Sequence, residues 1–466
     1  MRTTTAFGIH AAFLCAITFG STNARAQSSD SENAMSLFLQ AERAVFDGQY
    51  AKALTLYKRI ADKYPTTLAG AKAKIRTRDS AYLGQADIVR NGPSENRVDV
   101  VITGDGYMFK HQKALANLAR AVPKMFERNE TLGEYYAYHN FLCANVVSKD
   151  DGIDANGREY DTALGGHQSG YIQGQCNCDH KLVTQMLEEV TGNDGFAIVF
   201  VKQGVLGTGG GGIATVGGRG DKTTVHEWGH AFAGLCDEYA QTTGHRDGNR
   251  IGTNVTTDKN RIPWQHFLDK KVRGIGVYQG ANGMERGAWK PVASGCVMES
   301  GERFCKVCQE ALVLEIHRFV DPIDRCEPEA HYSERVSEER AREPLVLDQS
   351  LRFRVETMRP EKHAIELRWY VVPRASAPRV PFRSNMSDRR SRGKLGTLDA
   401  KPVEVRRSKS GKHEFVLAAK SLEPGEYRLY CRAIDTTEYP GDPVPWVLVD
   451  EFQLLQSERA WDITVH

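Results

Sequence analysis

The chain has 466 residues, of which 41% are hydrophobic and 26% charged, and its formal net charge is +2 at pH 7. This length accommodates two or three domains, and the composition is typical of a water-soluble globular protein. The balanced charge gives no support for nucleic-acid binding or for attachment to a charged membrane surface. Local motifs therefore carry the functional information.

The N-terminus has the organisation of a secretory signal peptide. Arg2 precedes the apolar run 11–19, and Ala24-Arg25-Ala26 is a small-residue cleavage site. We expect a signal peptide over residues 1–26, cleaved before Gln27, and hence an exported protein that is secreted or periplasmic. A short membrane anchor is the alternative, but the apolar run is too short to span a bilayer comfortably. No later segment is long enough, so no membrane span is expected after cleavage.

Residues 34–90 are predicted to form a helical unit. The spacing of small and aromatic residues from Ala34 to Pro65 resembles one tetratricopeptide repeat, a helix-turn-helix motif with Gly48 in the turn. A further helix is expected from Leu68 to Leu83. Because one repeat cannot bury its own apolar face, it must pack against something. We favour packing against the rest of the chain, and docking to a partner protein is the alternative.

An alternating α/β region follows and predicts a catalytic domain over residues 97–325. The glycine-rich residues 207–212 are expected to form a turn, and residues 238–295 to be rich in loops. The expected strands are Val98–Thr103, Asn140–Val147, Phe196–Val201 and Ile213–Val216, and the expected helices are about Phe109–Arg128, His180–Val190 and Phe304–His317.

From about Leu345 the pattern changes to short strands, which predicts an immunoglobulin-like β-sandwich over residues 345–456. Trp369 is its core candidate, and Tyr427 occupies a tyrosine-corner position. The expected strands are Leu351–Glu356, Ala364–Val372, Glu414–Ala418, Glu426–Ile434 and Trp446–Leu454.

The most informative motif is His226-Glu227-Trp228-Gly229-His230, an H-E-x-x-H string. On a helix the two histidines lie about one turn apart on the same face, so both imidazoles can face one zinc ion. Glu227 is then placed to act on water at that ion. The alternative is a pair of surface histidines on an ordinary helix, so the surrounding residues must support the motif.

A catalytic zinc site has three protein ligands and an open fourth position. If Gly234 ends the helix, the chain can turn back, and Asp237 then lies close enough to supply a carboxylate oxygen. Glu238 is the alternative third ligand. We expect one Zn²⁺ per chain, which acidifies water and polarises the scissile carbonyl. Glu227 would take the proton as general base and deliver it to the leaving amine.

The pattern H-E-x-x-H-x-x-x-G-x-x-D resembles the metzincin consensus, with one residue inserted before the glycine and an aspartate for the third histidine. Metzincins carry a methionine turn beneath the metal, and Met298 is the candidate here, with an ordinary core methionine as the alternative. They also place an edge strand before the helix, to which an extended substrate can pair. The corresponding residues are Ile213, Ala214, Thr215 and Val216.

The run His226–Tyr239 resembles the bacterial IgA metallopeptidase family of metzincin-like zinc peptidases. Three further matches support the resemblance, which covers about Arg97–Val320: Ile102–Tyr107, Tyr160–Gly165 and Phe304–Cys308. The resemblance implies an α/β (α+β) metzincin-like domain that acts on a protein or peptide substrate. It also implies the roles of four residues: His226, His230 and Asp237 as zinc ligands and Glu227 as the catalytic residue.

Nine cysteines remain after signal cleavage, and this odd count leaves at least one free thiol in an oxidising compartment. The pair Cys305-x-x-Cys308 suggests a second zinc site or a redox site. A structural zinc would need two further ligands. Because Cys296 is close in sequence, we expect a disulfide that staples the methionine turn.

Two classes of function are consistent with these features. The leading hypothesis is an exported zinc endopeptidase, and the alternative is a non-catalytic, zinc-stabilised adhesion or scaffold protein. The helical repeat and the β-sandwich, both common interaction modules, motivate the alternative. Glu227 favours the peptidase, because a purely structural zinc site has no use for a general base and no open fourth position.

Overall fold

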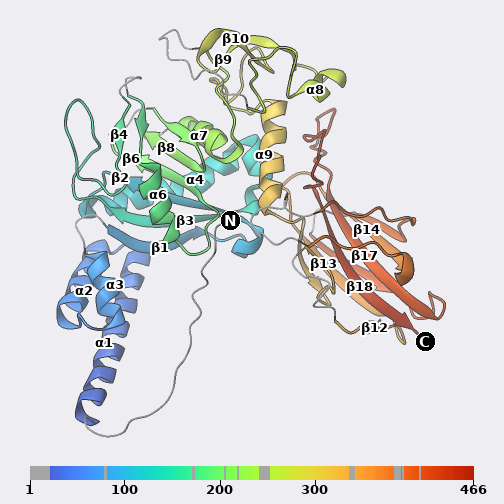
Figure 1. The fold of residues 1–466 in the computed structure, drawn as a ribbon, viewed down its shortest axis with the longest axis horizontal. Coiled ribbons are helices and arrows are strands. Elements are labelled where there is room, and N and C mark those ends of the chain that lie inside the picture. The colour runs from blue at the N-terminus through green and yellow to red at the C-terminus, as the bar shows by residue number, and fades with distance from the viewer. Residues whose placement is uncertain are drawn as a thin grey trace, which may run out of the picture. The chain divides into compact units, whose positions relative to one another are not determined.

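The computed structural model describes residues 21–77, 81–169, 174–203, 206–217, 220–240, 252–334, 342–382, 390, 393–408 and 411–466, and Figure 1 shows its ribbon. The chain divides into two compact units, Met1–Arg78 and Asp79–His466. Residues 1–20 of the predicted signal peptide lie outside the described residues, and its predicted cleavage site falls in helix α1 (Ser21–Phe46). Among the described helices, none is sufficiently long and apolar to cross a membrane.

The first unit consists of α1, α2 (Tyr50–Lys63) and α3 (Leu68–Arg76), which contact one another. Its core includes Phe38 and Tyr57, whose ring centroids lie 5.7 Å apart. The helix predicted to reach Leu83 is wrong beyond Arg76, because Ala81–Val89 forms strand β1 of the second unit. β1 is stabilised by pairing with a distant strand, which local periodicity does not register.

A six-stranded sheet opens the second unit, with the order β1-β3-β2-β6-β8-β7. Strands β3, β2, β6 and β8 are parallel, and β1 and β7 are antiparallel at the two edges. After β1, the strands are β2 (Val98–Asp105), β3 (His139–Val147), β6 (Phe196–Val201), β7 (Thr208–Gly210) and β8 (Ile213–Gly217).

Helices cover both faces of this sheet (Figure 1). Along β6, Ile198 packs in the core with α4, α7 and α9, whereas Val199 packs with α6. Burial on both faces explains why apolar residues occupy both faces of the central strands and not one face alone. The helices of this region are α4 (Gln112–Arg128), α5 (Glu130–Glu134), α6 (His180–Glu188), α7 (Asp221–Ala233), α8 (Gln265–Asp269) and α9 (Lys306–Phe319), and the short strands are β4 (His167–Gln168), β5 (Cys176–Asn177), β9 (Tyr278–Ala281) and β10 (Met284–Lys290).

The substrate edge strand predicted at Ile213, Ala214, Thr215 and Val216 is wrong in its position. These residues form β8, are buried, and pair with β6 on one side and β7 on the other. The edge is instead β7, in the glycine-rich segment that we expected to be only a turn. Three successive glycines from Gly210 to Gly212 have positive φ and reverse the chain between the two strands.

The C-terminal part of the second unit has a three-stranded sheet, β11-β13-β16, and a five-stranded sheet, β12-β18-β17-β14-β15. Both sheets contribute to one hydrophobic core, in which Trp369 is fully buried. The Tyr427 hydroxyl donates to the Glu423 carbonyl at 3.1 Å. The strands are β11 (Ile323–Glu327), β12 (Leu345–Val346), β13 (Leu351–Thr357), β14 (Ile365–Pro373), β15 (Glu404–Ser408), β16 (Lys412–Leu417), β17 (Gly425–Asp435) and β18 (Gln456–Val465).

The predicted boundaries of this part, 345–456, are too narrow. β11 begins within the predicted catalytic domain, and β18 begins where the predicted sandwich ends. The strand predicted at Trp446–Leu454 is wrong, because that segment is irregular and Trp446 packs in the core on one face of the six-stranded sheet. The mixed α/β class itself is confirmed by the alternation of helices and sheets.

Candidate active site

Helix α7 carries the H-E-x-x-H motif and ends at Ala233. Gly234 follows in the left-handed conformation with φ +63°, which glycine adopts without strain. Its N–H donates to the His230 carbonyl at 3.2 Å, and the Leu235 N–H donates to the Gly229 carbonyl at 3.2 Å. The chain therefore reverses at Gly234 and brings Asp237 back to the helix.

Three potential ligand atoms converge at this point. The Nε2 atoms of His226 and His230 lie 3.1 Å apart. Oδ1 of Asp237 lies 3.0 Å from Nε2 of His226 and 3.1 Å from Nε2 of His230. The side chain of His226 is 15% exposed, that of His230 7% and that of Asp237 25%. The cluster therefore reaches solvent mainly beside the aspartate.

Each histidine is oriented by a backbone carbonyl at its other ring nitrogen. Nδ1 of His226 lies 2.9 Å from the Val297 carbonyl, and Nδ1 of His230 lies 2.6 Å from the Leu235 carbonyl. Since a carbonyl only accepts hydrogen bonds, Nδ1 carries the proton in both rings. Both Nε2 atoms are thereby turned toward the cluster, as the outer shell of a metal site requires.

Burial and mutual contact set the charges of the cluster. Burial alone would raise the pKa of Asp237, but its hydrogen bonds with His226 and His230 hold that pKa well below its usual range. Burial would lower the pKa of His226, yet the hydrogen bond with Asp237 raises it to about 9. Burial raises the pKa of Glu227 to about 7, a value suited to proton exchange near neutral pH.

Met298 is fully buried beneath α7. A Cβ on Gly229 would lie 2.8 Å from Sδ of Met298, so only glycine leaves room for this contact. The Met298 carbonyl accepts from the N–H of Glu238 at 2.7 Å. The turn that carries Met298 thus supports the segment with Asp237, and through the Val297 carbonyl it also supports His226.

Glu238, the alternative third ligand, lies in different surroundings. Its side chain is fully buried, and Oε1 accepts from Asn254 Nδ2 at 3.0 Å and lies 3.1 Å from Sγ of Cys308. It is grouped with three cysteines rather than with the two histidines. The geometry therefore favours Asp237 and does not support Glu238 at this site.

Two neighbours of the site have no role in the sequence-based hypothesis. A Cβ on Gly209 of β7 would lie 2.3 Å from the Glu227 carbonyl oxygen and 2.7 Å from Cβ of His230, so β7 runs directly along α7. The Tyr239 ring stacks at 6.3 Å from that of His226. The glycines of residues 207–212 were the feature of the sequence that could have indicated β7. A strand whose backbone lies this close to a helix has no room for side chains at the contact.

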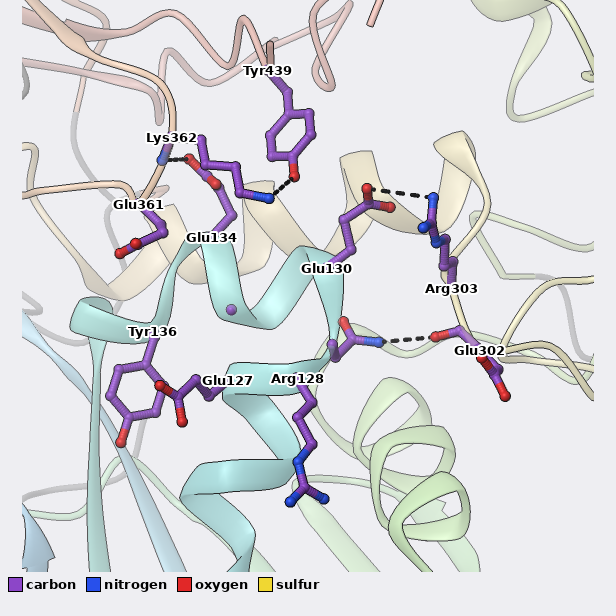
Figure 2. A pocket seen from close by; sticks show the side chains of 12 residues that line it. Glu127, Arg128, Glu130, Glu134, Tyr136, Glu302, Arg303, Glu361, Lys362 and Tyr439 are labelled. Atoms are coloured by element: carbon purple, nitrogen blue, oxygen red, sulfur yellow. Dashed lines mark hydrogen bonds and ion pairs between the residues drawn. The ribbon is translucent and has the colours of Figure 1, made fainter. Parts of the chain in front are cut away.

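A pocket of about 510 Å³ lies apart from these residues and is shown in Figure 2. Lys362 crosses it, donating from Nζ to the Tyr439 hydroxyl at 2.6 Å and from its backbone N–H to Oε1 of Glu134 at 2.8 Å. Its lining includes neither histidine nor cysteine. Its charged side chains include the ion pair of Arg303 with Glu130 at 3.7 Å, so it is a less suitable metal site than the cluster on α7.

The mixed sheet, the motif on α7 and a family match together define the class of this protein as a peptidase. Residues 86–273 match the model of the family described as IgA Peptidase M64, which is a metallopeptidase family. This match confirms the predicted resemblance to the bacterial IgA metallopeptidases, and it includes α7 and Asp237 but ends before Met298. No curated protein matches the chain.

Proposed function

We propose that the protein is an exported, zinc-dependent endopeptidase that cuts protein or peptide substrates. The observation that carries this proposal is the convergence of Nε2 of His226, Nε2 of His230 and Oδ1 of Asp237, with separations of 3.0 to 3.1 Å. Two imidazoles and one carboxylate are a ligand set of catalytic zinc, and they leave a fourth position for substrate chemistry. Backbone hydrogen bonds already orient both rings for this purpose.

The residues present fit a zinc ion chemically. Both histidines turn Nε2 toward the cluster, and Oδ1 of Asp237 lies within 3.1 Å of each of these atoms, so two imidazole nitrogens and one carboxylate oxygen face the same point. When bound, zinc would lower the pKa of water and polarise the scissile carbonyl. We assign one such ion to each chain, held by these three residues.

Glu227 is proposed as the general base. Its carboxylate and the two histidine ligand nitrogens all lie within 4.8 Å of one another, close enough to reach a shared water. Because burial raises its pKa to about 7, Glu227 can accept the proton of the attacking water and then donate it to the leaving amine. Its Cγ and Oε1 pack against Gly207, at 2.6 and 2.7 Å from a Cβ built there, which restricts the carboxylate to this side of α7.

The substrate is proposed to pair with β7. This strand is the sheet edge and lies directly beside Glu227 and His230, so an extended peptide added to it would pass the candidate ligands. The test uses substrate peptides that carry one N-methylated backbone amide within three residues of the cut. Where that amide would pair with β7, the methyl group removes the hydrogen-bond donor, and KM should rise at least tenfold. Equal KM values for every N-methylated peptide would contradict pairing by strand addition.

The remaining assignments are also proposals. The helical unit is assigned as tetratricopeptide-like, supported by its helix-turn-helix with Gly48 at φ +70°, and it offers a surface for a protein partner. The C-terminal sheets are assigned as immunoglobulin-like, supported by buried Trp369 and by the hydrogen bond of the Tyr427 hydroxyl. Export rests on the N-terminal signal sequence alone.

A digest of a diverse peptide library, read by mass spectrometry with and without a chelator, tests the proposed function. We expect internal cleavages that disappear with the chelator and return when zinc is added. Cleavage that persists after the protein has been shown to be zinc-free would contradict a metal-dependent mechanism. A zinc-loaded protein that cuts no peptide would favour a non-catalytic scaffold.

A further inference from the structure

Three cysteines and one glutamate form a second cluster next to the candidate active site. Cys296 precedes Met298 in the same turn, and Cys305 and Cys308 lie at and just inside the start of α9. Their sulfur atoms and one carboxylate oxygen of Glu238 all lie within 4.8 Å of one another. Cys296, Cys308 and Glu238 are buried, and Cys305 is partly buried. Four potential ligands thus face one interior point.

The spacing of these atoms differs from that of a disulfide. Sγ of Cys296 and Sγ of Cys308 are 3.8 Å apart, whereas a disulfide requires about 2.05 Å. The predicted disulfide staple is therefore not formed in this structure. With zinc–sulfur bonds of about 2.3 Å, two sulfurs of a tetrahedral site lie about 3.8 Å apart. The observed separation matches that edge of a zinc tetrahedron.

The surroundings of Glu238 provide independent evidence for a cation site. The side chain of this glutamate is fully buried, and its Oε2 has no hydrogen-bond partner among the residues that the structure describes. Oε1 receives a hydrogen bond from Asn254 at 3.0 Å and lies near two sulfurs, at 3.1 Å from Cys308 and 3.7 Å from Cys305. Lys290 donates to the backbone carbonyl of Glu238 and not to its carboxylate. A buried carboxylate oxygen without a partner is costly, and a metal ion would remove that cost.

We propose that Cys296, Cys305, Cys308 and Glu238 bind a second zinc ion, which is structural. Four protein ligands close the site to substrate, and thiolates select zinc over magnesium or calcium. The ion would join the turn that carries Met298, the start of α9 and the segment after Asp237. Since Glu238 adjoins Asp237 and Cys296 is two residues from Met298, this second ion would position the third ligand of the proposed catalytic zinc.

Cobalt substitution of the full-length protein tests the second site without any mutation. Thiolate ligands give Co²⁺ intense charge-transfer absorption in the near ultraviolet, whereas the His226, His230 and Asp237 set contains no sulfur. We expect two metal ions per chain by elemental analysis, and the thiolate band at saturation. One metal ion per chain without that band would overturn the proposal. So would a protein mass showing that two of these cysteines have lost their thiol hydrogens to form a disulfide.

Variants separate this proposal from the proposed catalytic zinc. Cys305→Ser and Cys308→Ser should each remove the thiolate band or weaken it at least threefold, and Glu238→Gln should alter its position. Cys326→Ser, a partly buried cysteine in β11, is the matched control and should leave the band intact. His230→Ala should lose the other metal ion but keep the band. If the band survived in both Cys305→Ser and Cys308→Ser, the assignment would be wrong, whatever the state of the catalytic site.

Discussion

At the scale of single residues, Asp237 decides whether the two histidines form a complete site. Its Oδ1 is the only described carboxylate oxygen placed at 3.0 to 3.1 Å from both Nε2 atoms. Asp237→Ala should therefore weaken zinc binding at the catalytic site by more than about 100-fold, because loss of an outer-shell partner alone costs 10–100-fold. Competition with a chromogenic chelator measures the affinity.

The matched control is Asp269→Ala, which removes an exposed carboxylate at the end of α8. Zinc affinity should be unchanged in that variant. Unchanged affinity in Asp237→Ala as well would show that another group supplies the third ligand.

Much of the candidate site could be predicted from sequence, because His226, Glu227 and His230 belong to one helical motif. The choice between Asp237 and Glu238 could not, since successive side chains of an extended segment point to opposite sides. Only the tertiary fold shows what each side meets: the histidines for Asp237 and the cysteines for Glu238. The three cysteines near Glu238 lie 58 or more positions away in the chain, beyond the reach of local pattern.

At the scale of elements, the packing of α7 on the turn with Met298 holds the site together. Gly229→Ala would place a Cβ 2.8 Å from Sδ of Met298. Because the core is close-packed, we expect a loss of about 1–3 kcal/mol in the free energy of unfolding, despite the better helix propensity of alanine. Peptidase activity should also fall as His226 and His230 shift. Denaturant unfolding measures the stability.

A double-mutant cycle with Met298→Ala tests the cause of that loss. Removal of the sulfur should make Gly229→Ala less costly than in the otherwise unchanged protein. Strictly additive effects of the two substitutions would mean that the Gly229–Met298 contact does not limit the packing of α7.

The strands show why sequence patterns located some elements and missed others. β2, β3, β6 and β8 are short apolar runs, which predict buried parallel strands. β18 was missed because its buried positions include charged residues whose partners lie on other segments: Glu458 is bonded to Arg432 at 2.6 Å and Asp462 to Arg428 at 2.7 Å. Such ion pairs leave no hydrophobic periodicity in the sequence.

At the scale of the whole molecule, a buried polar network joins the peptidase sheet region to the C-terminal sheets within the second unit. His363 bridges Oε1 of Glu134 at 2.7 Å and Oδ1 of Asp435 at 2.6 Å. His317 of α9 contacts the other oxygen of Asp435 at 3.0 Å. All four side chains are at most 1% exposed, so these charges must be paired to be tolerated.

This network predicts how stability depends on pH. Burial alone would lower the pKa of His363, but the charge of Asp435 raises it to about 9, above the ordinary 6.5. Its charged form therefore stabilises the fold fully below pH 6.5, and this contribution is lost as pH rises through 9. The loss is on the order of 3 kcal/mol, because each unit of pKa shift corresponds to about 1.4 kcal/mol. Denaturant unfolding at pH 6.5 and pH 9.5 measures it.

The corresponding variant is His363→Gln, in which stability should fall much less over the same range. His180→Gln, at an exposed position that begins α6, should behave like the unsubstituted protein. An equally steep fall with pH in His363→Gln would assign the effect to other groups.

In the proposed mechanism, Glu227 performs proton transfer at a zinc ion that other residues hold. Glu227→Gln keeps the size of the side chain but removes its basicity, so it separates zinc binding from proton transfer. Zinc content and cleavage of one identified peptide should be measured on the same purified sample. We predict the zinc content of the unsubstituted protein and a loss of kcat of at least 100-fold, within the range for general-base catalysis. Near-normal cleavage by zinc-loaded Glu227→Gln would contradict the proposed mechanism.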